Sequence, residues 1–381
     1  MITNKANRSR NLPNGLPFVY ASYVNNRNVG QVAVIDPDGD EIIQRLTGFF
    51  SPSAMCTDPS EQKLYVTDDY LNRVNIFRLD DFRPLGSVTV GTNPVAVFVE
   101  PSGKKAYVAS YGDYSVTIIN AVTNGWIKKL SMPSLQPGVL GRPFAFISNE
   151  KSPFVYVACK RDNGEDYLAY IGIEDDTVYR LDFELPLAFD ETRNPLVIRP
   201  DGSTLVSLAE VGIAYFVGHA PYNFNSTSLL DNTVSGVYLD NNMLFCTTRE
   251  NKDYLKVFVN LKIDEDRNIT YGNFIELSSY KGQDVIRTSR SQTYVGVTVQ
   301  PTLLPTGGLQ VIDVKSLQYE FVALDVVGDM TFFSDEKAYV AEINSVLSID
   351  LATMLPQNRI QIGGNDITVR NVISGYSNQS S

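Results

Sequence analysis

Residues 93–130 read NPVAVFVEPSGKKAYVASYGDYSVTIINAVTNGWIKKL, the clearest copy of a pattern that returns along the chain. The apolar run 95–99 suits a strand that is buried on both faces. A tight turn over 100–104 follows, in which proline fixes φ and glycine supplies a positive φ. Further strands are expected over 106–109, 115–120 and 126–130, with a loop at 111–114. The stretch therefore predicts one four-stranded antiparallel sheet.

The second strand of this unit, with its Tyr-Val core, has counterparts throughout the sequence. Its eight markers lie 39 to 50 residues apart, at Tyr20, Tyr65, Tyr107, Tyr156, Val206, Phe245, Tyr294 and Tyr339. A β-rich repeat of this period is typical of a β-propeller, in which stacked blades bury the apolar faces that one unit cannot bury alone. We predict an all-β chain of eight four-stranded antiparallel blades. A seven-bladed ring is the alternative, because the units between Val206 and Tyr294 are less regular.

The two ends of the repeat predict how the ring closes. The first marker, Tyr20, has no inner strand before it, whereas residues 366–370 resemble an inner strand with no blade after them. We expect this C-terminal strand to complete the first blade, because that removes two exposed sheet edges. The predicted organisation is a polar leader over 1–15, a single propeller over 16–372 and a polar tail over 373–381.

Composition and charge narrow the expected partners. The formal net charge of −11 disfavours nucleic acid and anionic lipid. Cys56, Cys159 and Cys246 fall in predicted strands of different blades, so they are expected to be buried, unpaired thiols. The leader lacks the apolar core of a secretory signal, and no stretch is apolar enough to span a bilayer. The expected location is the cytoplasm, or a particle or cell surface reached by a non-classical route.

Several second strands carry a more specific motif. Tyr65-Val-Thr-Asp68 is echoed by Tyr107-Val-Ala-Ser110 and Tyr339-Val-Ala-Glu342, and Gly91-Thr-Asn-Pro94 leads into an inner strand. These segments resemble the YVTN-type β-propeller repeat family. The resemblance implies the propeller fold. It leaves function open, because similar propellers include surface-layer and adhesive proteins, lactonase-type enzymes and subunits of redox complexes.

The residues offer little for acid–base or metal chemistry, so we predict no catalytic residue, no metal site and no cofactor. The single histidine, His219, lies in a loop. The resemblance to lactonase-type propellers implies a Gly-x-x-Pro-His motif, but Asn93-Pro94 and Arg142-Pro143 lack the histidine. Two acidic segments, 36–40 and 264–268, could suggest calcium sites. Their spacing departs from a calcium loop and they fall at hairpin turns, so turn formation is favoured.

We expect a ligand site where polar residues lead into the inner strands or follow the second strands. In a propeller, both groups gather on one face around the axis. We hypothesise a funnel with Arg142 and Arg193 towards one side and three carboxylates, Asp284, Asp329 and Asp366, across or beside them. The second group comprises Asp68, Lys160, Arg161, Glu210, Arg249 and Glu342. The alternative is a polar, water-filled channel mouth with no specific ligand.

These observations favour a non-catalytic propeller that acts as a structural or protein/carbohydrate interaction module. Aromatic and polar residues in the loops 111–114 and 219–226 suit such contacts. We expect a protein partner or assembly neighbour, within a larger surface, appendage or virus-like assembly. The alternative is a lactonase-like hydrolase or lyase that acts on a small polar substrate in the funnel.

Overall fold

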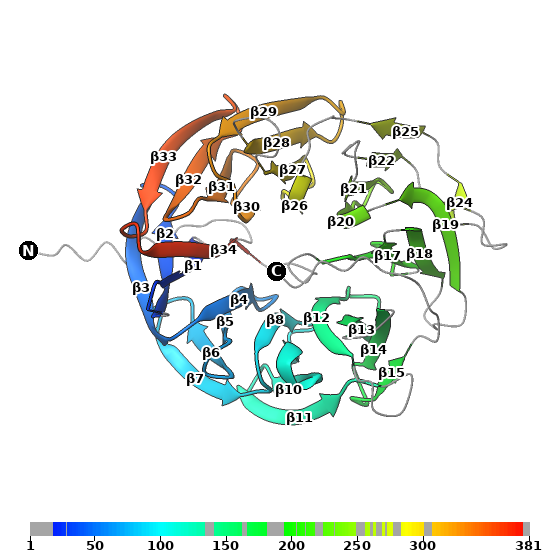
Figure 1. Ribbon diagram of the computed structural model, residues 1–381, viewed down its shortest axis with the longest axis horizontal. Helices are drawn as coiled ribbons and strands as arrows, with labels where there is room; N and C mark the ends of the chain where they lie inside the picture. The colour runs from blue at the N-terminus through cyan, green and yellow to red at the C-terminus, as the bar shows by residue number, and fades with distance from the viewer. Residues whose placement is uncertain are drawn as a thin grey trace, which may run out of the picture.

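The structure is a computed structural model in which β-sheets are arranged radially around a central axis (Figure 1). It describes residues 18–27, 29–133, 141–161, 166–180, 194–202, 204–209, 211–217, 224–231, 233–248, 256–259, 262–263, 269–270, 273–276, 283–300 and 307–375. Within these ranges the chain forms eight four-stranded antiparallel sheets and one two-stranded ribbon. This confirms the predicted eight-bladed propeller.

The first four blades, numbered along the chain and written from the innermost strand outwards, follow one order. Blade 1 comprises β34 (Ile367–Ile373), β1 (Val19–Asn25), β2 (Gly30–Asp36) and β3 (Glu41–Phe49). Blade 2 comprises β4 (Pro52–Thr57), β5 (Lys63–Asp68), β6 (Arg73–Arg78) and β7 (Pro84–Thr89). Blade 3 comprises β8 (Pro94–Val99), β9 (Lys105–Ser110), the 3₁₀ turn η2 (Tyr111–Asp113), β10 (Ser115–Asn120) and β11 (Gly125–Ser131). Blade 4 comprises β12 (Arg142–Ile147), β13 (Phe154–Lys160), β14 (Tyr167–Gly172) and β15 (Val178–Arg180).

The other four blades repeat this order. Blade 5 comprises β16 (Leu196–Ile198), β17 (Thr204–Ala209), β18 (Val211–Val217) and β19 (Phe224–Asp231). Blade 6 comprises β20 (Thr233–Tyr238), β21 (Leu244–Thr248), β22 (Lys256–Val259) and β25 (Asn273–Glu276), with the ribbon β23 (Lys262–Ile263) and β24 (Ile269–Thr270). Blade 7 comprises β26 (Gln283–Thr288), β27 (Tyr294–Val299), β28 (Gly307–Asp313) and β29 (Tyr319–Leu324). Blade 8 comprises β30 (Met330–Phe332), β31 (Lys337–Ala341), β32 (Ser345–Asp350) and β33 (Leu355–Gln361).

The ring closes through the C-terminal strand, as the sequence predicts. β34 pairs antiparallel with β1, with Ile373 opposite Tyr20 and Ile367 opposite Asn25. The red β34 and the blue β1 lie side by side in Figure 1. Because the first and last strands of the repeat share one sheet, the ring cannot open at blade 1 without breaking the hydrogen bonds between β1 and β34.

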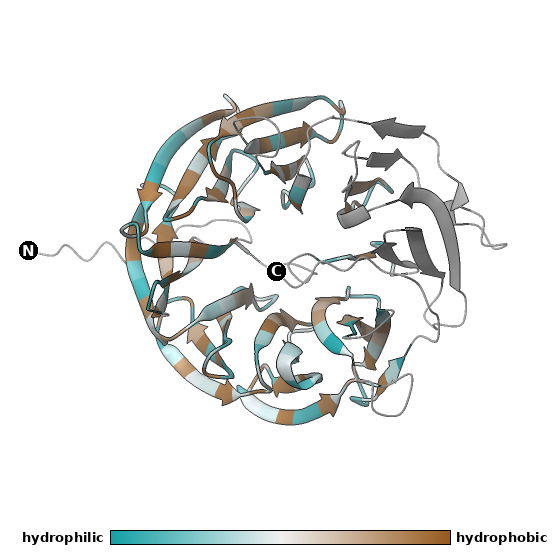
Figure 2. Cartoon of the chain, in the orientation of Figure 1, coloured by the Kyte–Doolittle hydropathy of each residue, from teal (hydrophilic) through white to brown (hydrophobic). Residues whose placement is uncertain are grey.

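The apolar core lies between neighbouring blades. The tyrosines at the centre of the second strands, Tyr20, Tyr65, Tyr107 and Tyr339, are fully buried. The inner three strands of blades 2 and 3 and strands β1 and β2 of blade 1 are mostly buried, β34 is partly exposed, and the outer strands β3, β7 and β11 are mostly exposed. Figure 2 shows this as brown segments on the inner strands and alternating teal and brown on the outer ones.

The hairpin between the third and fourth strands has the same shape in six blades. In each, the residue four positions after the end of the third strand has a left-handed conformation, with φ between 49° and 60°. These residues are Asp40, Phe82, Asn124, Asp176, Leu317 and Met354. Turn caps also form where the third strand ends in Asp or Asn: Asp36, Asn120, Asp313 and Asp350 each accept a backbone N–H two or three residues later.

The three cysteines form no disulfide, as predicted; Cys159 and Cys246 are buried and Cys56 is partly buried. Within the described ranges, no helix combines the length and apolar character that crossing a membrane would need.

Candidate functional site

Arg142 begins the inner strand β12 and is held by two tyrosines of the blade 3 loop. Its guanidinium lies 5.1 Å from the ring centre of Tyr111 and 4.3 Å from that of Tyr114. Nη1 donates to the Tyr111 carbonyl at 2.9 Å, and Nη2 donates to the Tyr114 hydroxyl at 2.7 Å. The aromatic loop predicted to contact a partner therefore packs around an arginine of the next blade.

Two of the predicted carboxylates take part in contacts between blades 7, 8 and 1. Asp284 is buried in β26 and accepts a hydrogen bond from Gln300, which also donates to the Val327 carbonyl. Asp329, just before β30, pairs with Arg287 of blade 7 at 3.2 Å. Its second carboxylate oxygen accepts the backbone N–H of Val372 in β34 at 3.0 Å.

The other two predicted funnel residues are Asp366 and Arg193. The side chain of Asp366 is exposed just before β34, and its carbonyl accepts the backbone N–H of Asn26 at 2.9 Å. Arg193 lies outside the described residues, as do Glu210, Arg249, His219 and the acidic segment 264–268. The described funnel residues thus come from blades 4, 7, 8 and 1.

The carboxylates that follow the second strands bind neighbouring groups of the protein. Asp68, at the end of β5, is fully buried and accepts the backbone N–H groups of Phe50, Ser51 and Leu71. Glu342, after β31, forms a two-pronged ion pair with Arg359 at 2.8 and 2.9 Å. Both carboxylates therefore have structural partners. In the ranges that the structure describes, no group of three or more His, Cys, Asp or Glu could hold a metal ion.

A repeated lysine contact joins neighbouring blades. The lysine two residues before a marker tyrosine reaches the hairpin of the next blade, where it meets a backbone carbonyl and the left-handed Asn or Asp. Lys63 contacts the Ala121 carbonyl (2.5 Å) and Asn124 (2.9 Å), Lys105 contacts the Ile173 carbonyl (2.6 Å) and Asp176 (2.6 Å), and Lys337 contacts the Pro37 carbonyl (2.8 Å) and Asp40 (2.9 Å). We call this arrangement the lysine staple.

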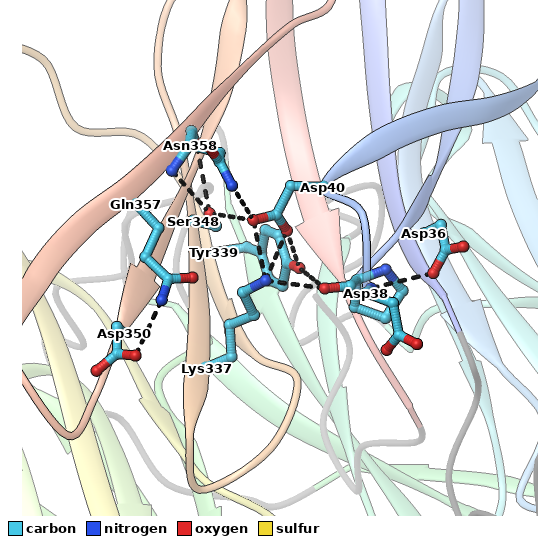
Figure 3. A network of polar contacts seen from close by, with 10 residues as sticks. Asp36, Asp38, Asp40, Lys337, Tyr339, Ser348, Asp350, Gln357 and Asn358 are labelled. Atoms are coloured by element: carbon cyan, nitrogen blue, oxygen red, sulfur yellow. Dashed lines mark hydrogen bonds and ion pairs between the residues drawn. The ribbon is translucent and has the colours of Figure 1, made fainter.

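The staple between blades 8 and 1 has the most hydrogen bonds of the three. Figure 3 shows Asp40 surrounded by Lys337, Tyr339, Ser348 and Asn358, which donate to its carboxylate at 2.6 to 2.9 Å. Burial raises the pKa of Asp40, but these four hydrogen bonds outweigh it and lower the pKa below its ordinary value. The acidic segment 36–40 is therefore a turn that ties two blades together.

An apolar contact replaces the lysine staple between blades 1 and 2. Phe18 occupies the lysine position and Phe82 the left-handed position, and their rings meet edge to face at 5.2 Å. The buried hydroxyl of Tyr20 has no hydrogen-bond partner among the described residues. Two positions form this contact: the residue two before the marker and the residue four after the end of the third strand. They can therefore hold either a lysine with Asn or Asp, or an aromatic pair.

A cleft of about 850 Å³ opens beside the staple between blades 3 and 4. It is lined by the β8–β9 turn on one side and by the β12–β13 and β14–β15 turns on the other. These turns are at the opposite end of the inner strands from Arg142. The aromatic part of the wall consists of Phe154, Tyr170 and Tyr179.

Two of the cysteines are poor candidates for nucleophiles. Burial raises the pKa of the Cys56 thiol and that of the Cys159 thiol. Since the thiolate is the nucleophilic form, both groups act as small apolar side chains.

Sequence reasoning missed the lysine staples, the ion pair of Arg287 and the cleft. The staples had a readable signal, because Lys-x-Tyr recurs at 63–65, 105–107 and 337–339. Arg287 could have been noticed as a charged residue inside an inner strand. The cleft had no such signal, because it depends on three turns that meet only in the folded ring.

Comparison with known proteins supports the fold. No family model matches the chain, and no curated protein matches it. Among solved structures, the dihydro-heme d1 dehydrogenase NirN in complex with DHE is similar over 94% of this chain and 75% of that one, at 15% identity and a TM-score of 0.73. AztD from Citrobacter koseri is similar over 94% of this chain and 98% of that one, at 13% identity and a TM-score of 0.64. A putative 6-phosphogluconolactonase from Bacteroides uniformis is similar over 81% and 97%, at 9% identity and a TM-score of 0.53. At these identities the likeness shows that this chain is a β-propeller.

Proposed function

We propose that this chain is a non-catalytic β-propeller that acts as a rigid interaction module for a protein or carbohydrate partner within a larger assembly. The observation that carries the proposal is the cleft of about 850 Å³ between blades 3 and 4. Its volume falls in the range of ligand pockets, and its aromatic wall suits a bound side chain or sugar.

The polar groups around the inner strands support the non-catalytic part of the proposal. Asp68, Asp329 and Glu342 accept hydrogen bonds from backbone N–H groups, arginines or a serine. A general acid or base must exchange a proton with a substrate, whereas these carboxylates already hold the structure together. The funnel formed by Arg142, Arg193, Asp284, Asp329 and Asp366 is kept in the proposal as a second ligand surface.

Membership of the YVTN-type repeat family is also part of the proposal. The Tyr-Val segments at Tyr65, Tyr107 and Tyr339 support it, because all three occupy the same second-strand position in their blades. A structural or adhesive role fits the members of that family that have no catalytic site.

The test measures binding and turnover in the same samples. The purified chain is incubated with oligosaccharides, peptides and sugar lactones, its thermal midpoint is recorded, and the small molecules are analysed by mass spectrometry. We expect stabilisation by at least one oligosaccharide or peptide and no chemical conversion. Hydrolysis of a lactone that Asp329→Asn abolishes would overturn the proposal.

Native mass spectrometry tests the assembly part. We expect the chain to occur in particles larger than the 42.3 kDa monomer when isolated from its source. A monomer under those conditions, at every concentration measured, would contradict the assembly role.

A further inference from the structure

The cleft between blades 3 and 4 contains a stacked aromatic pair with one ring open to solvent. Tyr170 and Tyr179 lie opposite each other on β14 and β15, with ring centres 5.0 Å apart and planes 15° apart. Phe154 meets Tyr170 edge to face at 4.9 Å. Tyr170 is buried, but Tyr179 is 40% exposed. The stack therefore exposes the Tyr179 ring to solvent and holds it in place against Tyr170.

The turns around this aromatic stack are fixed by hydrogen bonds. Lys105 bridges blade 3 to the β14–β15 turn through Ile173 and Asp176, with both contacts at 2.6 Å. On the opposite wall, the Glu100 carboxylate accepts N–H groups of its own turn from Ser102, Lys104 and Lys105. A site whose walls are held in this way loses little conformational entropy on binding.

The charges that remain available in the cleft are mostly negative. Glu150 and Glu174 line the cleft, are exposed and have no hydrogen bond or ion pair among the described residues. Asp175 accepts the Thr177 backbone N–H and, at 3.3 Å, the Tyr179 hydroxyl. The wall holds four carboxylates and two lysines, and one of these, Lys105, is already paired with Asp176. The cleft is therefore an acidic surface with an aromatic platform.

We propose that this cleft binds an arginine side chain from an extended, basic segment of a protein partner. The inference rests on the proposed interaction function and names its ligand. A guanidinium is planar and always charged, so it can lie over the open face of Tyr179 while it donates to Glu174 or Glu150. Lysine would supply the charge but neither the flat face of a guanidinium nor its fork of donors, so it could not lie flat on the ring and donate two parallel hydrogen bonds to a carboxylate.

The same chain already shows this chemistry within its own fold. Arg142 lies 4.3 Å from the ring centre of Tyr114 while it donates to that tyrosine's hydroxyl and to the Tyr111 carbonyl. In the cleft, Tyr179 and the carboxylates of Glu150 and Glu174 offer a comparable platform and acceptors, and no arginine is among the described residues that line it.

Beside the site, the position that holds the staple lysine in three blades holds an aromatic residue. In blades 2, 3 and 8 the residue two before the marker tyrosine is the staple lysine, but in blade 4 it is Phe154, which packs on Tyr170. Blade 4 thus has, at the lysine position, an aromatic side chain that packs within its own blade and lines the cleft.

The test is fluorescence anisotropy with the full chain and a fluorescein-labelled octapeptide, GRSRGRSG. Its matched control is the same peptide with citrulline in place of each arginine, which keeps the shape and removes the charge. We expect the arginine peptide to bind at least tenfold more tightly, and binding to weaken as NaCl is raised from 50 to 300 mM.

Two substitutions test the location of the site, each with a matched control. Tyr179→Leu should weaken binding about fivefold, whereas Tyr319→Leu, at a tyrosine 39% exposed on the outer strand of blade 7, should leave it unchanged. Glu174→Gln should weaken binding about threefold, whereas Glu320→Gln on β29 should not.

Two results would overturn the arginine ligand and leave the interaction function standing. One is equal binding of the citrulline peptide. The other is binding of a neutral oligosaccharide, such as chitotriose, that requires Tyr179 and does not depend on salt, in the absence of arginine-peptide binding. Lactone turnover in the same preparation would instead contradict the proposed function itself.

Discussion

Removal of Asp40 should destabilise the ring where its two ends meet. The Asp40 side chain is 2% exposed and that of Lys337 is 18% exposed, so the pair is largely screened from water. Asp40→Ala leaves Lys337 with the Pro37 carbonyl and removes the acceptor of three further donors. Removing one partner of a buried ion pair costs about 3–5 kcal/mol. Because Lys337 keeps one acceptor and some water, we expect about 3 kcal/mol.

Two other variants separate the contribution of the Asp40 charge to stability from that of the turn conformation. Asp40 has a φ of 49°, a conformation in which alanine is less stable than aspartate or asparagine, so part of the loss is local. Asp40→Asn keeps the turn and a carbonyl acceptor, as Asn124 does opposite Lys63, and should cost about 1 kcal/mol. Lys337→Met leaves the turn untouched and should cost about 1–2 kcal/mol, because Asp40 keeps Tyr339, Ser348 and Asn358.

The assay is urea unfolding followed by tyrosine and tryptophan fluorescence, with the midpoint and slope compared between variants. Hydrogen exchange of the β1 and β34 amides reports whether the loss is local to the ring closure. The reasoning is refuted if Asp40→Ala changes the free energy of unfolding by less than about 0.5 kcal/mol. It is also refuted if Asp40→Asn costs as much as Asp40→Ala.

Three further predictions follow from the same contacts. The folded-state pKa of Asp40 is lowered, so its stabilisation is present above its unfolded value, about 3.9, and is lost as pH falls through the lower folded value. The stability gap between wild type and Asp40→Asn, measured by urea unfolding, should therefore stay constant from pH 5 to 7 and shrink below pH 4; a gap that grows there would contradict this. Asp329→Ala should cost about 2 kcal/mol and speed exchange of the Val372 amide, because it removes the acceptor of Arg287 and of that amide; unchanged exchange would count against it. Deletion of residues 367–381 removes the inner strand of blade 1 and should abolish the cooperative transition or lower its midpoint by more than Asp40→Ala does; a wild-type midpoint would show that β34 does not close the ring.

The blade count and the closure could be predicted because each rests on a local pattern that repeats. The Tyr-Val markers and the turn residues fix where strands begin and end, and residues 366–370 stood out as a strand without a blade. The outcome was an inner strand over Ile367–Ile373 that pairs with β1. Local signals of this kind survive in the sequence because every blade must satisfy the same packing.

The partners of the polar side chains could not be predicted from the sequence, because they depend on residues far apart in the chain. Asp329 was predicted as a funnel ligand, yet its carboxylate meets Arg287, 42 residues earlier, and Val372, 43 residues later. Arg142 was likewise predicted to face a ligand, and it stacks on two tyrosines of the preceding blade. Residue type indicated where polar groups would gather, but not which of them would form hydrogen bonds or ion pairs within the protein.

The inter-blade contacts connect the fold to the proposed site. A propeller needs each blade to hold the next. At four interfaces this chain makes a contact at one structural position, with Lys63, Lys105 and Lys337 or with an aromatic pair. This position holds a lysine in blades 2, 3 and 8 and a phenylalanine in blades 1 and 4. In blade 4 the phenylalanine, Phe154, lies beside Tyr170 and Tyr179 at the wall of the cleft. Asp176, four residues after β14, still receives Lys105 from blade 3, so blade 4 stays anchored while its own aromatic side chains face the cleft. The site therefore combines a frame fixed by Lys105 and the core aromatics with an exposed ring, Tyr179, and exposed carboxylates, which is the arrangement expected of a binding surface built on a rigid scaffold.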